Sequence, residues 1–312
     1  MQQMRLSLRG LLFAAAVIGF VASGIAWLHP WLPWWAELPM HLTIFHALAL
    51  AVVGTGLALT RAWRWAAACA VLAILHLIPS LGWLPPRTQT GPAQVRVLVA
   101  NVLTSNHQRE RLLALIAREQ PDVVALVEVD DAWLAALAPL SATYPYRLDE
   151  PRDDNFGVAL FSRRPLHEAV IIHPGAFDLP VIDVRLGGEC PIRLVLAHPP
   201  PPVSGEYAAV RNAMLSELAT ILASDPRTVL VGDLNCTPWA APFRQLLRNG
   251  RLRDSRDGIG AQASWPTPLG MLGIPIDHVL VGAAVTVSER RLGDAIGSDH
   301  RPVIVGLRVQ QK

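Results

Sequence analysis

Residues 228–235 read TVLVGDLN, and this stretch decides the fold of the C-terminal part of the chain. Its apolar, β-branched run predicts a buried strand. Asp233 and Asn235 stand where that strand ends. A GDLN sequence alone is also compatible with a β-turn, so the segments around it have to decide between a turn and a functional site.

The same arrangement recurs outward from this stretch. Polar residues adjoin five further apolar runs: Asn101 after VRVLVA, Glu128 after DVVALV, His198 after IRLVLA, Asp277 before HVLV, and Asp299-His300 before PVIV. Any one of these acids is as well explained by a helix cap or a turn. The ordered series is more specific, because strand ends on one edge of a sheet converge and six segments can then build one pocket.

Strand patterns alternate with helical ones across residues 94–312. The predicted strands are 94–101, 122–129, 156–162, 167–173, 179–186, 191–198, 228–235, 276–281, 285–293 and 302–309. The predicted helices are 107–120, 130–140, 205–224 and 238–250. Many neighbouring strands follow one another without a helix, which favours a layered α/β sandwich over a doubly wound parallel sheet.

The set of polar residues indicates metal-assisted hydrolysis. It contains carboxylates, amides and two imidazoles, with no Ser or Cys nucleophile. Hard oxygen ligands favour Mg²⁺ or Mn²⁺ over zinc.

Residues 94–308 resemble the endonuclease/exonuclease/phosphatase superfamily, the fold of DNase I, abasic-site endonucleases, sphingomyelinases and inositol-phosphate phosphatases. The resemblance rests on RVLVANV, PDVVALVEV, FGVALFSRRPL, LVLAHP, VLVGDLN, IDHVLV and GSDHRPV, in that order. It implies a four-layer α/β sandwich with the active site at one end of two packed sheets.

The resemblance also implies roles for the polar residues. Glu128 would bind metal, with Asn101 beside it and Asp299 helping. Asp233 would orient the attacking water, and Asn235 would hold a phosphate oxygen. His198 would contact phosphate or act as an acid, and Asp277 would orient His300, the second imidazole. These groups meet the needs of phosphoester hydrolysis, namely an in-line water, neutralised oxygen charge and help for the leaving group.

One position departs from the abasic-site endonucleases, which carry an acid two residues after the first Asn. Here that residue is Leu103. The departure favours one metal ion over two and the phosphatase and sphingomyelinase side of the superfamily.

Three further residues are candidates for substrate binding. Asn155 and Trp265 lie in loops that would overhang the site in this fold. Arg211, on the predicted helix 205–224, would meet a second phosphate. The alternative for Arg211 is a solvated residue on the helix face.

The cysteines are expected to stay unpaired in this fold. Cys190 begins the strand that ends at His198, whereas Cys236 follows the active-site end of the neighbouring strand. Eight residues of strand separate these two levels by about 26 Å, too far for a disulfide.

Residues 1–86 have the composition of a membrane segment. Their only charged residues are Arg5, Arg9, Glu37, Arg61 and Arg64. Three charge-free runs of 27, 23 and 22 residues result, at 10–36, 38–60 and 65–86. Each is long enough for a helix that crosses the hydrocarbon core. We expect a three-helix transmembrane anchor over 1–86, with spans at about 11–28, 40–59 and 65–84, a linker at 87–93 and the catalytic domain at 94–312.

The arginines indicate the orientation of the anchor. Arg5 and Arg9 precede the first span, and Arg61 and Arg64 lie between the second and third. The positive-inside rule places these residues in the cytoplasm. The prediction is a multi-pass protein of the cell (inner) membrane with a cytoplasmic N-terminus and an extracytoplasmic catalytic domain. If the first span is instead a cleaved signal peptide, the catalytic domain stays outside.

Three functions are compatible with this organisation. The first is a membrane-anchored hydrolase of a phosphorylated lipid or small envelope phosphoester, an arrangement that resembles the membrane proteins of teicoplanin resistance. The second is an extracytoplasmic nuclease, and the third is a membrane module with a decayed site. The intact residue set argues against the third. Residues 87–312 have a net charge of −1 and one lysine. That charge favours a lipid or small phosphoester over nucleic acid, whose binding draws on Lys and Arg.

Overall fold

The computed structural model of the protein describes residues 7–83, 91–175 and 177–310. Arg5, residues 87–90 of the expected linker and residues 311–312 of the expected catalytic domain lie outside the described residues. The chain divides into two compact units, each described here by itself. A helical unit contains residues 1–82 with 239–241, and an α/β unit contains residues 83–238 and 242–312.

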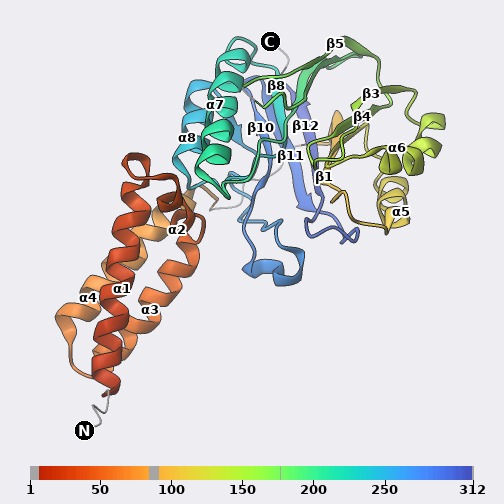
Figure 1. The fold of residues 1–312 in the computed structure, drawn as a ribbon. Helices are drawn as coiled ribbons and strands as arrows, with labels where there is room; N and C mark the ends of the chain where they lie inside the picture. The colour runs from red at the N-terminus through yellow and green to blue at the C-terminus, as the bar shows by residue number, and fades with distance from the viewer. Residues whose placement is uncertain (1–6, 84–90, 176, 311–312) are drawn as a thin grey trace. The chain divides into compact units, whose positions relative to one another are not determined.

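Two six-stranded sheets form the centre of the α/β unit (Figure 1). The first sheet has the order β11-β12-β1-β2-β4-β3. Its strands are β1 (Val95–Asn101), β2 (Val123–Val127), β3 (Tyr146–Glu150), β4 (Val158–Ser162), β11 (Val285–Leu292) and β12 (Val303–Val309). Only β1 and β2 pair in parallel among the described strands of this sheet.

The second sheet has the order β5-β6-β7-β8-β10-β9. Its strands are β5 (Leu166–Ile172), β6 (Val181–Leu186), β7 (Ile192–Leu196), β8 (Thr228–Asp233), β9 (Arg253–Asp254) and β10 (Asp277–Val281). Here β7 and β8 form the parallel pair of the described strands. Each sheet therefore contains one parallel pair, and a helix-containing crossover joins its two strands.

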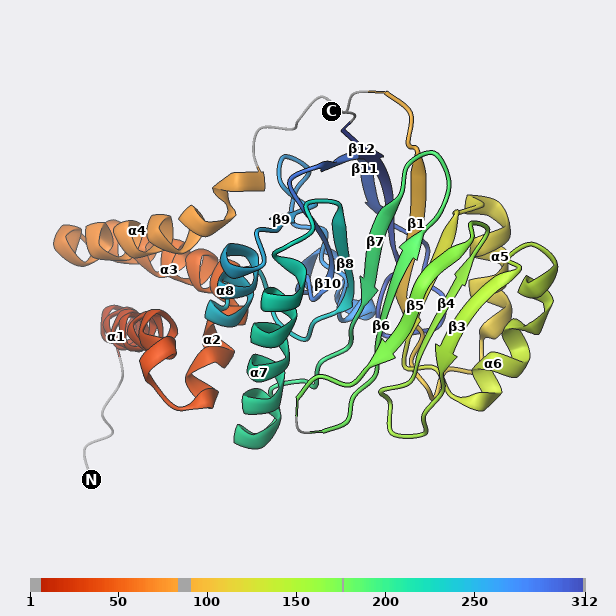
Figure 2. The ribbon, with the colours of Figure 1, turned by 90° about the horizontal axis from the view of Figure 1, so that it is seen from above.

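Helices cover the outer faces of the two sheets, as seen from above in Figure 2. On the first sheet these are α5 (Arg109–Glu119) and α6 (Asp131–Leu137), and on the second α7 (Gly205–Leu222) and α8 (Ala241–Asn249). The predicted strands and helices are all present within a few residues, and the layering fits the expected α/β sandwich. Two strands escaped the prediction, β3 and β9.

Apolar side chains fill the space between the sheets. Val97, Val99 and Val123 of the first sheet belong to the same buried cluster as Val184 and Leu194 of the second sheet. A second cluster joins the opposite face of the first sheet to α5 and α6. Because side chains alternate along a strand, central strands buried on both faces read as continuous apolar runs. That is why these strands were recognisable in the sequence.

The helical unit contains α1 (Leu8–Leu28), α2 (Leu38–His41), α3 (Thr43–Leu59) and α4 (Trp63–Leu77). Short 3₁₀ segments lie at His29–Trp31, Trp34–Glu37 and Ile78–Trp83. Among the described residues, two segments are long and apolar enough to cross a membrane, Leu8–Trp31 and Trp63–Gly82. A third crossing exists only if Trp34–His41 and Thr43–Leu59, bent by 65°, count as one span.

Of the three predicted spans, the second differs most from the structure. The helical pattern over 40–59 is interrupted at Leu42, so the continuous helix α3 has 17 residues. At about 1.5 Å per residue it is about 26 Å long, slightly shorter than a typical hydrocarbon core. The sequence predicted the apolar length but not the break.

His76 is the centre of a hydrogen-bonded network within the helical unit. Its Nδ1 lies 2.7 Å from Thr43 Oγ1 of α3, and its Nε2 lies 2.9 Å from Ser23 Oγ of α1. One imidazole thus links three helices of the unit, and all three side chains are buried. A satisfied hydrogen-bond network of this kind explains the histidine without a cofactor.

Candidate active site

The two parallel strand pairs bring four predicted site residues to one edge of the sandwich. Asn101 is the last residue of β1, and Glu128 directly follows β2, its parallel partner. In the other sheet, Asp233 is the last residue of β8, and His198 follows β7, which runs parallel to it. Parallel strands present their carboxyl ends on the same edge, so the four side chains converge.

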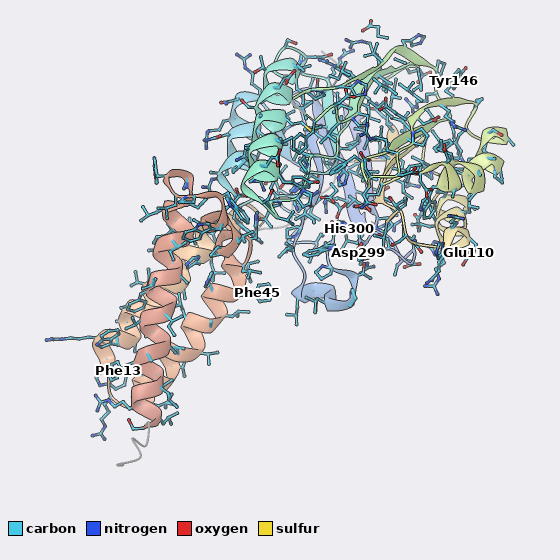
Figure 3. All side chains as sticks on the ribbon, in the orientation of Figure 1. Phe13, Phe45, Glu110, Tyr146, Asp299 and His300 are labelled. Carbon is cyan, nitrogen blue, oxygen red and sulfur yellow. The ribbon has the colours of Figure 1, made fainter. Side chains whose placement is uncertain are left out.

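Two antiparallel strands add their starting ends to the same edge. Asp277 opens β10 and pairs in register with Asp233. Asp299 and His300 precede β12, which runs antiparallel to β1. Figure 3 shows Asp299 and His300 at this edge of the α/β unit. The sequence prediction that these strand ends converge is therefore correct in its geometry.

An Asp277–His300–Asp233 group forms the centre of the site. His300 Nδ1 donates a hydrogen bond to Asp277 Oδ2 over 2.9 Å. The opposite ring nitrogen, Nε2, lies 3.7 Å from Asp233 Oδ2. All three residues are at least 95% buried. The imidazole is therefore held between two carboxylates, one bonded to Nδ1 and one facing Nε2, and Asn101 Nδ2 also lies 3.5 Å from Nε2.

Charge and burial act against each other in this group. Burial lowers the pKa of His300, but the charges of Asp277 and Asp233 outweigh burial and raise that pKa to about 10. Burial raises the pKa of Asp233 to about 6. Burial also opposes ionisation of Asp277, yet the His300 imidazolium lowers the pKa of Asp277. The group thus combines a stable ion pair with a carboxyl that exchanges a proton near neutral pH.

Asn101 and Glu128 form a second, adjoining cluster. Asn101 Nδ2 donates to Glu128 Oε1 over 2.6 Å and to Asp233 Oδ2 over 3.2 Å. Its Oδ1 accepts a hydrogen bond from the backbone N–H of Leu103. Asn101 therefore presents its nitrogen, not its oxygen, to the carboxylates. In this orientation the amide nitrogen is bonded to Glu128 and the amide oxygen to the Leu103 backbone.

His198 connects the two clusters. Its Nδ1–H donates to the backbone carbonyl of Asp233 over 3.0 Å, which leaves Nε2 facing Glu128 Oε1 at 3.7 Å. Burial lowers the pKa of His198, but Glu128 and Asp233 outweigh that effect, so the pKa is raised. In the same way burial raises the pKa of Glu128, but His198 and Asn101 lower it overall. The centre of the Phe156 ring lies 5.5 Å from the centre of the His198 ring.

The turn after β8 is held in place from two sides. Asn235 has a left-handed φ of +48°, an uncommon conformation for a non-glycine residue. Arg211 Nη1 of α7 donates to the Asn235 carbonyl over 3.1 Å, and His278 Nε2 donates to the Cys236 carbonyl over 2.8 Å. Asn235 Nδ2 donates to the Pro199 carbonyl over 3.0 Å, which leaves its second N–H for another acceptor.

The sequence did not predict the burial of Arg211 or the contacts of His278. Arg211 is fully buried, so the alternative of a solvated helix-face residue is wrong. His278 is also fully buried, and a guanidinium N–H of Arg256 donates to its Nδ1. Since a guanidinium cannot accept a hydrogen bond, His278 must carry its proton on Nε2. The one signal in the sequence was the position of His278 directly after Asp277.

The rim of the site contains the two remaining candidates. Trp265 Nε1 donates to Asp299 Oδ2 over 2.8 Å, and its ring centre lies 6.3 Å from that of His300. Asn155 is exposed, with φ +70°, one residue before Phe156. Trp265 and Asp299 thus form a pair at the edge of the central group, and Asn155 immediately precedes Phe156, the residue that packs against His198.

Cys190 and Cys236 are both buried. Cys190 lies before β7 and Cys236 after β8, and these strands run parallel. The two thiols are therefore at opposite ends of this strand pair.

The donor chemistry fits a divalent cation. One ligand atom from each of Asp233, Asp277 and His300 lies within 4.8 Å of the others. The Asp277–His300 hydrogen bond uses one oxygen of Asp277 and one nitrogen of His300. Glu128 adjoins this group through Asn101, whose Nδ2 donates to both Glu128 and Asp233. Asp299 has one oxygen bound by Trp265. Carboxylate oxygens at this density match the preference of Mg²⁺ and Mn²⁺.

The chain belongs to the endonuclease/exonuclease/phosphatase family, because the model of that family matches residues 98–300. Its members are phosphoester hydrolases, typically dependent on a divalent metal, and this chain is therefore a hydrolase of that class. No curated protein matches the chain in sequence.

Several solved structures share the fold. A 3′ phosphatase from Neisseria bound to a product DNA hairpin is 21% identical, with a TM-score of 0.56 over 70% of this chain and 100% of that one. The human Nocturnin catalytic domain with bound sulfate is 20% identical, with a TM-score of 0.55 over 69% and 94%. Zebrafish TDP2 with a single-stranded DNA product is 17% identical, with a TM-score of 0.56 over 69% and 99%. At these identities the likeness concerns the fold.

Proposed function

We propose that this family member is a membrane-anchored, divalent-metal-dependent phosphoester hydrolase. Its active site would lie outside the cytoplasm and act on a phosphorylated lipid or a small envelope phosphoester. The observation that carries the hydrolytic part is the buried Asp277–His300–Asp233 group beside Glu128 and His198. The observation that carries the membrane part is the apolar helical unit.

Asp233 is proposed as the group that takes a proton from the attacking water. Its raised pKa, about 6, suits a base that works near neutral pH. Its Oδ1 accepts from the backbone N–H of Asn235 over 2.9 Å, and its Oδ2 accepts the longer bond from Asn101 over 3.2 Å. We therefore assign Oδ2 as the atom that would accept the proton. The free N–H of Asn235 would then donate to a phosphoryl oxygen.

His300 is proposed to stabilise the charge that develops on the phosphoryl group. Because Asp277 keeps it cationic, the imidazolium Nε2–H is a strong, preorganised donor. His198 supplies the second imidazole, and its Nε2 lies 3.7 Å from Glu128 Oε1. It would contact the phosphate or donate a proton to the leaving group.

Glu128 and Asp299 are the residues proposed to hold the metal, with Asn101 orienting Glu128. A bound divalent cation would neutralise negative charge on the phosphoryl and leaving-group oxygens. We retain the expectation of one ion rather than two, because Leu103 stands where a further acid would be needed.

The membrane part of the proposal rests on the helices and the arginines. Three spans, with the bent α2–α3 pair counted as one, put Arg9 and the Arg61–Arg64 turn on the cytoplasmic side. The α/β unit then lies outside. A three-span anchor followed by this catalytic fold resembles the teicoplanin-resistance membrane proteins, and we propose that subtype for this chain.

Charge supports a lipid or small phosphoester over nucleic acid. Residues 87–312 have a net charge of −1 and one lysine, whereas nucleases draw affinity from counterions released by Lys and Arg. The anchor would also keep the site close to lipid phosphates, which raises their effective concentration.

The test assays the full chain, purified in detergent, with Mg²⁺ and with EDTA. The substrates are isoprenyl pyrophosphate, plasmid DNA and bis(p-nitrophenyl) phosphate. We expect Mg²⁺-dependent hydrolysis of the lipid that His300→Ala removes. Turnover that persists in EDTA would contradict the mechanism. Rapid DNA nicking that His300→Ala removes would replace the lipid substrate by nucleic acid, the alternative function.

Topology needs its own test. A reporter fused after residue 93 is expected to be active only in the version that works outside the cytoplasm. Activity of the cytoplasm-specific reporter would contradict the proposed orientation while leaving the hydrolytic chemistry untouched.

A further inference from the structure

A closed loop projects from the catalytic edge between β9 and β10. Its base is an antiparallel bridge between Trp265 and Ile274, and Trp265 N donates to the Ile274 carbonyl over 3.0 Å. Between them lies a 3₁₀ segment, Thr267–Leu272. Figure 1 shows this loop extending beyond the ends of the strands, and Figure 3 places it next to the labelled His300 and Asp299.

The base of the loop is bonded to the active site. Thr267 N donates to the backbone carbonyl of Asp299 over 2.7 Å, and Thr267 Oγ1 donates to the Ser298 carbonyl over 3.2 Å. Trp265 Nε1 donates to the Asp299 carboxylate. Hydrogen bonds therefore connect the base of the loop to the segment that contains Asp299 and His300.

The tip exposes three large apolar side chains to solvent. Leu269 is 52% exposed, Leu272 60% and Met271 98%. They lie within residues 258–276, which contain no Asp, Glu, Lys or Arg and form the longest such run in residues 94–312. Water-exposed apolar surface of this kind is unfavourable in isolation, and a contiguous patch next to a site indicates a contact surface.

The occupant that fits best is the interfacial region of a lipid bilayer. The same chain carries helices apolar enough to cross a membrane. Residues 83 and 95 are separated by at most about 40 Å of extended chain, so a membrane-inserted helical unit would hold the α/β unit near the lipid surface. Insertion of this tip would require no charged side chain to leave water, which is the main cost of entering lipid.

We propose that the tip of the 265–274 loop inserts into the bilayer interface through Leu269, Met271 and Leu272. This insertion would bring the catalytic edge to the level of the lipid phosphates. This inference rests on the proposed membrane-anchored hydrolase. It adds a second attachment point beside the active site itself, at a position that the anchor alone does not fix. The flexible thioether of Met271 suits contact with fluid, irregular acyl chains.

A label at the tip tests the contact directly. Cys69, Cys190 and Cys236 are all buried, so Met271→Cys offers one accessible thiol for an environment-sensitive fluorophore. The full chain is labelled and reconstituted into phosphatidylglycerol–phosphatidylcholine vesicles. We expect a blue-shifted emission that brominated acyl chains quench. The matched control is Val170→Cys, an exposed apolar residue of strand β5, whose label should remain water-like. A label at 271 that behaves like the one at 170 would overturn the proposal.

Kinetics separate this proposal from the proposed function. The variant Leu269→Ser/Met271→Ser/Leu272→Ser should lose about tenfold or more in turnover of isoprenyl pyrophosphate in vesicles. It should hydrolyse soluble bis(p-nitrophenyl) phosphate at the unaltered rate, and Val170→Ser should match the parent on both substrates. Equal lipid turnover in all three proteins would overturn the loop proposal and leave the hydrolase intact. A parent chain inactive on every phosphoester would instead contradict the proposed function. Binding of the labelled tip to a soluble protein, with no response to vesicles, would replace the bilayer by a protein partner.

Discussion

At the residue scale, the bond between Asp277 and His300 determines the charge of the site. Both side chains are buried, and the imidazole faces Asp233 with its second nitrogen. Loss of the Asp277 charge would remove one of the two carboxylates that raise the pKa of His300 against burial. The ring could then also adopt the other tautomer. The pair therefore fixes protonation and orientation together.

The substitution Asp277→Asn isolates this effect. We expect kcat on a soluble phosphodiester to fall by about 10²–10⁴, the range of a lost acid–base group, with little change in overall shape. Steady-state kinetics at saturating Mg²⁺ measures the loss. The matched control is Asp294→Asn, a carboxylate whose side chain is 71% exposed and paired with Arg118. Equal rates for both variants would show that the pair has no part in turnover.

A substitution of Arg211 distinguishes two roles. The side chain either binds phosphate itself or positions the turn that contains Asn235. Its guanidinium is buried and bonded to the Asn235 carbonyl. Arg211→Met should therefore lower kcat by about tenfold through a misplaced Asn235, with KM nearly unchanged. A phosphate-binding arginine would instead show its loss mainly as a raised KM. Measuring both constants with the soluble phosphodiester decides between the two roles.

The sequence revealed the polar residues at strand ends because each interrupts an apolar run. Asn101, Glu128, Asp233 and His300 were all recognisable in this way. Burial of Arg211 was not, since a buried arginine and a solvated one look the same within an amphipathic helix pattern. The orientation of the Asn101 amide was equally hidden, because it depends on the Leu103 backbone.

At the element scale, the close contact between β7 and β8 depends on Gly232. Its φ is +136°, and a Cβ there would lie 2.0 Å from the Ala197 carbonyl oxygen. The two strands carry His198 and Asp233, so this approach sets the spacing within the site. A side chain at this position would push the parallel strands apart.

We expect Gly232→Ala to lower the free energy of unfolding by about 2–5 kcal/mol, from steric overlap and backbone strain combined. Urea unfolding of the full chain in detergent, followed by tryptophan fluorescence, provides the value. Gly260→Ala is the informative comparison. Its φ is +120°, but a Cβ there meets nothing within 4 Å, so it carries the strain alone. If both variants lose the same stability, the overlap with Ala197 has no measurable effect.

The elements that the sequence missed have physical reasons in common. The strand β3 reads YRLDE and lies at the edge of its sheet with no fully buried residue, so it lacks an apolar run. The strand β9 has two residues, fewer than any periodicity can reveal. The central strands, buried on both faces, were predicted correctly. The break at Leu42 escaped because an apolar run specifies a helical segment without specifying that it is straight.

At the scale of the whole molecule, metal binding and folding are linked. The proposed ligands Glu128 and Asp299 come from separate segments that meet only in the folded α/β unit. A cation bound there stabilises the folded state by mass action, by about 2.7 kcal/mol at a concentration of about 100 times Kd.

Mg²⁺ should therefore raise the Tm of the full chain in detergent, and EDTA should reverse the shift. Glu128→Gln should abolish the Mg²⁺ effect while changing the Tm in EDTA much less. Differential scanning fluorimetry of both proteins across a Mg²⁺ titration gives the result. A shift of equal size in Glu128→Gln would place the cation elsewhere.

The position of β12 has a consequence in time. This strand lies between β11 and β1, and the Asp299-His300 segment immediately precedes it. During synthesis β1 emerges early and must wait, with one side unpaired, for about 200 further residues to follow. Because the proposed catalytic residue His300 enters the site with β12, we expect the nascent chain to be inactive until this last described strand has been made. For a phosphoester hydrolase built in this order, we expect activity to begin only after synthesis of the strand that completes its first sheet.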